Sequence, residues 1–275
     1  MFKREYHCLV AGLPDLVLEQ GAKKFDIKAL IEEVFEHTSE HDHEYIRELF
    51  LSYDHQNIHN LLQGREDLFD EKGQFSLEFL KEHLDQPDDM PQYLIDIIRK
   101  FRLGHELGDR SDEYHNMAHY TWSRFYQEIE NTSKNRFVRA WWRFDQLLRN
   151  IQGAWMCRKL GVSMKEQLVG WDEEIEHFVK TNLPDFGLRR EMAFGEQIFN
   201  LLDEQIDLLE REFRFDLILW QMADELTTFN YFDIDKVLAH LAKADILDRW
   251  LKLDKERGAV LFDSFVKTLV EQKNI

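Results

Sequence analysis

The sequence has 275 residues, 44% of them hydrophobic, and its 53 acidic and 35 basic side chains give a formal net charge of −18. Such a chain can bury a sizeable core, which excludes a disordered protein, and it lacks the excess of lysine and arginine that nucleic-acid binding requires. With two cysteines, no signal peptide and no apolar run near the roughly 20 residues of a membrane span, we expect a cytoplasmic protein with no direct membrane span.

In chain order, the first apolar segment is 6–11, whose pattern fits either a short strand or a helix. Helical periodicity dominates from there on. Each helix predicted in the N-terminal third starts at a residue that favours a helix N-terminus: Asp26, Ser39, Asp54, Ser76 and Pro91. The helix after Ser39 is expected to end near Ser52, and the helix after Asp54 to end at Gly64.

Longer helices are predicted over the rest of the chain: 111–131, 133–160, 163–182, 188–228, 233–253 and 259–271. In the second of these, apolar residues recur at spacings of four and three from Phe137 to Trp155, which predicts a seam that packs on other helices. Ser163 and Glu166 match a capping box for the third, and Gly195 is a candidate break within the fourth.

The fold class is therefore predicted as all-α, built from many helices. Polar stretches that contain prolines divide the chain into three tentative sub-bundles, 1–90, 91–184 and 185–275. Pairs of an aromatic residue and an aspartate recur at a similar interval, and each precedes apolar residues: Tyr53-Asp54, Phe144-Asp145 and Phe232-Asp233. We interpret the pairs as a structural motif, and either a threefold repeat or chance accounts for their spacing.

The charge is uneven along the chain, and the segment 134–159 is basic within an acidic sequence. On the helix predicted there, Arg136, Arg139 and Arg143 share one face. This face is either the solvated side of an amphipathic helix or a strip that binds the acidic surface of a protein. Both interpretations stay open at the level of the sequence.

The sequence contains no glycine-rich phosphate loop and no Gly-x-Ser-x-Gly nucleophile elbow. We therefore predict no catalytic residues, no cofactor and no enzyme activity. Glu174 and His177 match the Glu-x-x-His spacing of helical di-iron carboxylate sites, although so acidic a chain produces this spacing by chance. A helical di-metal carboxylate enzyme is kept as an alternative function.

Several segments resemble proteins of V-type rotary ATPases. Residues 6–16, 226–233 and 249–254 look like parts of a bacterial family that is encoded with V-type ATPases. Residues 53–65 resemble the Asp-x-x-Asn-Ile/Leu-x-x-Leu-Leu-Arg signature of the C-type (also called d-type) subunits of V-type ATP synthases. The sequence departs from that signature at Gln63, where the family has its arginine, so no role is assigned to that position.

The resemblance implies a funnel of three related helical bundles that takes part in ion or proton transport without catalysis. It implies an adaptor that binds the central stalk and the membrane rotor ring, and that lies on the cytoplasmic side of the inner membrane through these protein partners. Tyr53, Asp54 and Asn57 are expected to be structural, with Asp54 as a helix cap. A stand-alone helical scaffold protein is the remaining alternative.

Overall fold

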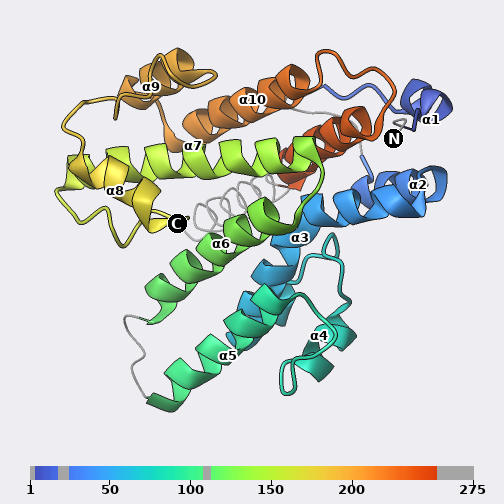
Figure 1. Ribbon diagram of the computed structural model, residues 1–275, viewed down its shortest axis with the longest axis horizontal. Helices are drawn as coiled ribbons and strands as arrows, with labels where there is room; N and C mark the ends of the chain where they lie inside the picture. Colours follow the sequence, from blue (N-terminus) through green and yellow to red (C-terminus); the bar gives the residue numbers. More distant parts are fainter. Residues whose placement is uncertain (1–3, 18–24, 108–112, 253–275) are drawn as a thin grey trace, which may run out of the picture. The chain divides into compact units, whose positions relative to one another are not determined.

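The computed structural model describes residues 4–17, 25–107 and 113–252, which form helices joined by loops (Figure 1). No strand occurs in these ranges, so the described chain is all-α, as the sequence predicts. The segment for which a strand was the alternative forms helix α1 (His7–Gly12). None of the described helices combines the length and the apolar character that a membrane crossing needs.

The chain divides into two compact units, Met1–Ser39 together with Ala223–Ile275, and Glu40–Met222. This division neither requires nor excludes internal similarity between the predicted sub-bundles 1–90, 91–184 and 185–275. Three related bundles therefore stay a prediction.

The first unit contains α1, α2 (Ile27–His37) and a helix over residues 234–252. Asp26 caps α2, as predicted, because its carboxylate accepts hydrogen bonds from the N–H groups of the first helical turn. Asp233 caps the helix 234–252 in the same way, accepting from the N–H of Lys236 at 3.3 Å. The helix predicted over 259–271 lies outside the described residues.

The second unit begins with α3 (Glu40–Leu62), a single helix where the sequence analysis predicted two. The assignment of Asp54 as a helix cap is therefore wrong. No glycine or proline interrupts 52–57, and buried residues continue through this stretch, so packing carries the helix across the expected break. The other elements of this half are η1 (Glu66–Leu68), α4 (Leu77–His83), α5 (Gln92–Leu107) and α6 (Glu113–Thr132).

The starts of α4 and α5 agree with the sequence. The hydroxyl of Ser76 accepts a hydrogen bond from the N–H of Phe79 at 3.2 Å, which caps α4. Helix α5 begins directly after Pro91. The predicted start of the following helix at Ser111 lies outside the described residues.

Helix α7 (Arg136–Leu160) packs alongside α6 and contributes many buried residues to this unit (Figure 1). It starts three residues later than predicted, because Asn135 rather than Ser133 accepts the capping bond, from the N–H of Val138. Gly161, with a φ of +67°, ends it as predicted. The predicted seam is confirmed, since its residues are buried up to Trp155, which is partly buried.

The capping box at Ser163 and Glu166 is wrong, because neither residue lies in a helix and α8 (Asp172–Lys180) begins later. The amide of Asn150 on α7 binds both the N–H and the carbonyl of Val169, each at 2.8 Å. Gly170 follows with a φ of +117°. These contacts hold the chain in a non-helical conformation where a helix was expected from the sequence.

The helix predicted over 188–228 is two helices, α9 (Gly195–Asp203) and α10 (Leu208–Leu226). Gly195 begins α9 rather than breaking a longer helix. The main interruption is at 204–207, where the carboxylate of Asp207 accepts from the N–H of Glu210 and caps α10. Helices α7 to α10 share one apolar core, which includes Phe144, Leu148, Ile151, Ile175, Phe178, Ile198, Phe199, Phe215 and Ile218.

Candidate functional site

Asp54 and Asn57, one turn apart on α3, bind the loop 69–75 to that helix. Asn57 exchanges two hydrogen bonds with the backbone of Asp70, its Nδ2 donating to the carbonyl at 2.7 Å and its Oδ1 accepting from the N–H at 2.8 Å. Oδ1 of Asp54 accepts from the N–H of Phe75 at 3.1 Å. Residues three positions apart share a helix face, so the Asp-x-x-Asn pattern forms a loop-binding face, which we call the α3 clamp.

The clamp depends on a close approach of the loop backbone. A Cβ atom added to Gly73 would lie 2.6 Å from Oδ1 of Asp54 and 3.1 Å from Nδ2 of Asn57. The carboxyl of Asp54 is fully buried, and burial raises its pKa to about 6 although two backbone N–H groups lower it. Tyr53 contacts the same loop, because its hydroxyl oxygen accepts from Nζ of Lys72 at 2.7 Å.

The second aromatic–aspartate pair lies inside α7. Phe144 is buried, with its ring edge-on to that of Phe194. Asp145 accepts a hydrogen bond from the hydroxyl of Tyr126 at 2.5 Å, and Nε of Arg149 donates to the same hydroxyl oxygen at 3.1 Å. Burial raises the pKa of Tyr126, which keeps it protonated as the donor. This pair therefore joins α6 to α7.

The third pair opens a helix, as predicted, and the three pairs thus occupy three different settings. Asp54 lies in the middle of a helix and binds a loop, Asp145 belongs to a network between helices, and Asp233 is an N-cap. The shared residue types do not correspond to a shared local structure.

Glu174 and His177 both lie on α8 but have separate partners. Glu174 forms an ion pair with Arg143 and accepts a hydrogen bond from Nε2 of Gln146 at 3.1 Å. Nε2 of His177 is 3.0 Å from the carbonyl oxygen of Phe186. The structure thus brings Glu174 together with Arg143, and the di-metal alternative gains no support from these contacts.

Of the three arginines in the predicted basic strip, two have side chains without a partner in the described chain. Arg136 and Arg139 are exposed on α7, and their side chains form no hydrogen bond or ion pair with the part of the chain that the structure describes. Arg143 is exposed as well, but its guanidinium is engaged by Glu174. Arg136 and Arg139 are therefore the members of the strip that are available to a partner.

The sequence analysis missed a cluster of exposed aromatic residues, which we call the aromatic loop (229–232). Phe229 is 88% exposed, Tyr231 68% and Phe232 39%. Large apolar side chains that gather on a surface are typical of sites of protein association. Three aromatic residues without helical spacing, directly before the cap residue Asp233, are the signal that could have revealed this loop.

Several contacts of the first unit hold the aromatic loop in place. The amide of Asn230 donates to the carboxylates of Asp233 and Asp235. The N–H of Tyr6 donates to the carbonyl of Phe232 at 2.5 Å, and the ring of His7 lies 4.2 Å from that of Phe232 between centroids. The exposed rings are thus presented on an ordered backbone, which lowers the entropy lost on binding.

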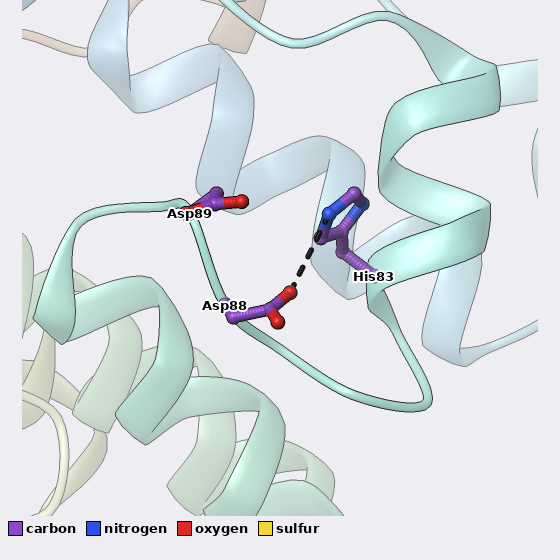
Figure 2. Close-up of side chains that lie close together, drawn as sticks. All are labelled: His83, Asp88 and Asp89. Atoms are coloured by element: carbon purple, nitrogen blue, oxygen red, sulfur yellow. Dashed lines mark ion pairs between the residues drawn. The ribbon is translucent and has the colours of Figure 1, made fainter.

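A second group that the sequence analysis missed consists of His83, Asp88 and Asp89 (Figure 2). Within the described ranges, these are the only three side chains of metal-ligating type whose ligand atoms all lie within 4.8 Å of one another. A histidine at a helix end, followed after a proline by two adjacent aspartates, is the signal in the sequence.

A family model described as a protein of unknown function (DUF2764) matches residues 3–273. The chain belongs to this family. In comparisons with curated proteins and with solved structures, no protein matches. The region that the DUF2764 family shares therefore includes the α3 clamp, the aromatic loop and the His83 group.

Proposed function

We propose that this chain is a non-catalytic helical adaptor of a V-type rotary ATPase, which couples the central stalk to the membrane rotor ring. It acts by binding these protein partners on the cytoplasmic side of the inner membrane. The proposal starts from two resemblances: residues 53–65 resemble a subunit of such complexes, and residues 6–16 and 226–233 resemble a bacterial family that is encoded with them.

The aromatic loop is the observation that carries the proposal. It falls within 226–233, one of the segments that resemble the family encoded with V-type ATPases. There it presents Phe229 and Tyr231 to solvent on an ordered backbone. Glu225 is exposed close to it in the sequence, so the loop suits a partner surface that is apolar with a basic residue at its rim.

The α3 clamp supports the same proposal from a second segment. The residues that resemble the C/d-type signature bind the backbone of a loop, which is an architectural role rather than a chemical one. A protein that transmits torque must be stiff, and long close-packed helices such as α3 and α7 supply stiffness.

Arg136 and Arg139 add a candidate second contact of opposite character. Their free guanidinium groups suit an acidic partner surface, where they would raise the association rate and fix the orientation. An adaptor of this kind must hold two different partners, and an aromatic and a basic surface provide two different kinds of contact.

The test is affinity purification of the tagged full chain from the cells that encode it, followed by identification of the proteins that accompany it. We expect stalk and rotor-ring proteins with the unchanged chain, and their loss with the double substitution Phe229→Ser/Tyr231→Ser. The matched control is Leu208→Ser, which removes an apolar side chain that is 71% exposed on α10. The control should retain the partners.

Other outcomes would decide against the proposal. Intact, coupled ATPase complexes that lack this chain would end it. Recovery of partners none of which belongs to an ATPase would favour the stand-alone scaffold instead. If Leu208→Ser removed the partners as fully as the loop substitutions do, the aromatic loop would not be the contact.

A further inference from the structure

His83 and two aspartates face one another across the connection between α4 and α5. His83 is the last residue of α4, and Asp88 and Asp89 lie in the segment that leads to α5. Figure 2 shows the imidazole facing this segment, with carboxylate oxygens of both aspartates directed toward the imidazole.

The orientation of the imidazole is fixed from outside this group. Nδ1 of His83 lies 2.8 Å from the carbonyl oxygen of Phe79, and a carbonyl can only accept, so Nδ1 carries the hydrogen. The imidazole also stacks on the ring of Phe79, with 3.9 Å between centroids. Histidines that bind metals typically donate their second N–H to a backbone carbonyl in this manner. Nε2 is thus the nitrogen that is left for a ligand.

Nε2 points at a group that cannot donate to it. It lies 3.5 Å from Oδ1 of Asp88. A neutral imidazole with its hydrogen on Nδ1 has a lone pair at Nε2, and a carboxylate oxygen also offers only lone pairs. This contact is favourable only if a cation lies between the two atoms, either a proton on Nε2 or a metal ion. A metal ion can also bind Asp89, which a single proton cannot do.

The connection that holds the two aspartates is anchored independently of them. The guanidinium of Arg102 on α5 donates to the carbonyl of Asp85 at 2.6 Å and to its carboxylate at 2.7 Å. Pro87 and Pro91 restrict the backbone on either side of the aspartates. Because both ends of the segment are fixed, the ligands stay near His83 in the protein without an ion.

We propose that His83, Asp88 and Asp89 bind one divalent transition-metal ion such as Zn²⁺, which fastens the α4–α5 connection. One imidazole nitrogen and two carboxylate oxygens are a ligand set that Zn²⁺ accepts, and the two carboxylates neutralise its charge. Ligand atoms at about 2.0–2.2 Å from zinc lie roughly 3–4 Å from one another. In the structure the ligand atoms lie within 4.8 Å of one another, and both aspartate side chains are exposed.

The test is a calorimetric titration of the full chain with Zn²⁺, together with the melting temperature in Zn²⁺ and in EDTA. We expect one equivalent of bound Zn²⁺ and a higher melting temperature in its presence. In His83→Gln, Asp88→Asn and Asp89→Asn, the affinity of that equivalent should fall at least about ten-fold.

Two matched controls separate this site from adventitious binding by other side chains. His37 also ends a helix with its Nδ1 2.8 Å from a backbone carbonyl, that of Glu33, but it belongs to no such group of ligands in the described chain. His37→Gln should therefore retain the bound equivalent. Glu82→Gln removes a neighbouring exposed charge and should also retain it. If the unchanged chain binds no Zn²⁺ saturably, or if the three site variants bind it as the controls do, the cation between Nε2 and Asp88 is a proton and the proposal fails.

Discussion

The pairs Tyr53-Asp54 and Phe232-Asp233 are alike in sequence but have different structural roles. In the first pair, the aspartate is fully buried inside α3 and the tyrosine binds a lysine of the loop that the aspartate holds. In the second, the aspartate caps a helix and the phenylalanine is exposed in the aromatic loop. Both residues of the first pair make contacts within the fold, whereas the second pair leaves an aromatic ring exposed to solvent.

The difference comes from the neighbouring residues rather than from the pairs. Before Asp233, Thr227 and Asn230 form turns whose hydrogen bonds stop α10 and leave the backbone free to be capped. Before Asp54, the helix continues because its apolar positions remain buried on both sides. A short motif therefore acquires its role only from what packs around it.

The largest effect is expected from Asn57→Ala, which would break the α3 clamp to which Asp54 of the first pair belongs. Alanine leaves both the N–H and the carbonyl of Asp70 without their partner, so the free energy of unfolding should fall by about 2–4 kcal/mol. Urea unfolding measures it. The matched control is Asn60→Ala on the same helix, which removes two exposed hydrogen bonds, one of 3.2 Å to the carbonyl of Leu68 and one of 3.3 Å from Arg65, and should cost under about 1 kcal/mol. Equal losses in the two variants would contradict the clamp.

The next effect concerns the protonation of Asp54. Its pKa is raised from 3.8 to about 6 in the folded protein, so the folded state binds the proton more tightly than the unfolded chain does. Ionised Asp54 therefore lowers stability above about pH 6, and this cost disappears as the pH falls toward 4. The side chain of Asp54→Asn stays neutral at every pH. The free energy of unfolding of this variant should therefore exceed that of the unchanged protein by up to about 3 kcal/mol at pH 8 and by nothing near pH 4.

The measurement is the difference in unfolding free energy between the two proteins across this pH range. Other buried groups titrate as well, since burial raises the pKa of Glu48 to about 7 and lowers that of His55 to about 3. Both proteins share these groups, so their contributions cancel in the difference. A difference that does not change with pH would show that Asp54 is not the group responsible.

A smaller effect on stability is expected at the pair Phe232-Asp233. Asp233→Ala removes the N-cap of the helix 234–252 and should lower the free energy of unfolding by about 1 kcal/mol. Asp26→Ala, which removes the cap of α2, is the matched comparison and should cost a similar amount. A loss several times larger at Asp233 alone would mean that it also has an internal role like that of Asp54.

The smallest effect on stability is expected in the aromatic loop itself. Phe229→Ser changes a side chain that is 88% exposed, so the free energy of unfolding, measured by thermal denaturation, should change by no more than about 0.5 kcal/mol. Partner binding should nevertheless be lost if the loop is the contact surface. A large loss of stability would mean that Phe229 contributes to the packing of this protein. The main support for the aromatic loop as a partner-binding surface would then be removed.

The sequence predicted what local chemistry controls. Asp26, Ser76 and Gly161 mark helix ends where the structure has them, because a cap or a left-handed glycine acts within one turn. The all-α class and the buried seam of α7 followed from periodicity in the same way.

The errors arose where distant residues decide the local structure. Asn150 binds the backbone of Val169 within the segment where the sequence predicted a helix after Ser163. Asp54, predicted as a cap, instead accepts a hydrogen bond from the loop at Phe75. The same limit hid the His83 group, whose aspartates lie in a connection that Arg102 on α5 binds through Asp85. No pattern within one helix encodes such contacts.

The close approach at Gly73 has a consequence for the evolution of this family. Any side chain at that position would occupy the space that the carboxyl of Asp54 now fills. Relatives that place a larger residue there should carry a shorter one at the position of Asp54, so the two columns of an alignment should vary together. Where that covariation is found, the loop must be attached to the helix by another bond.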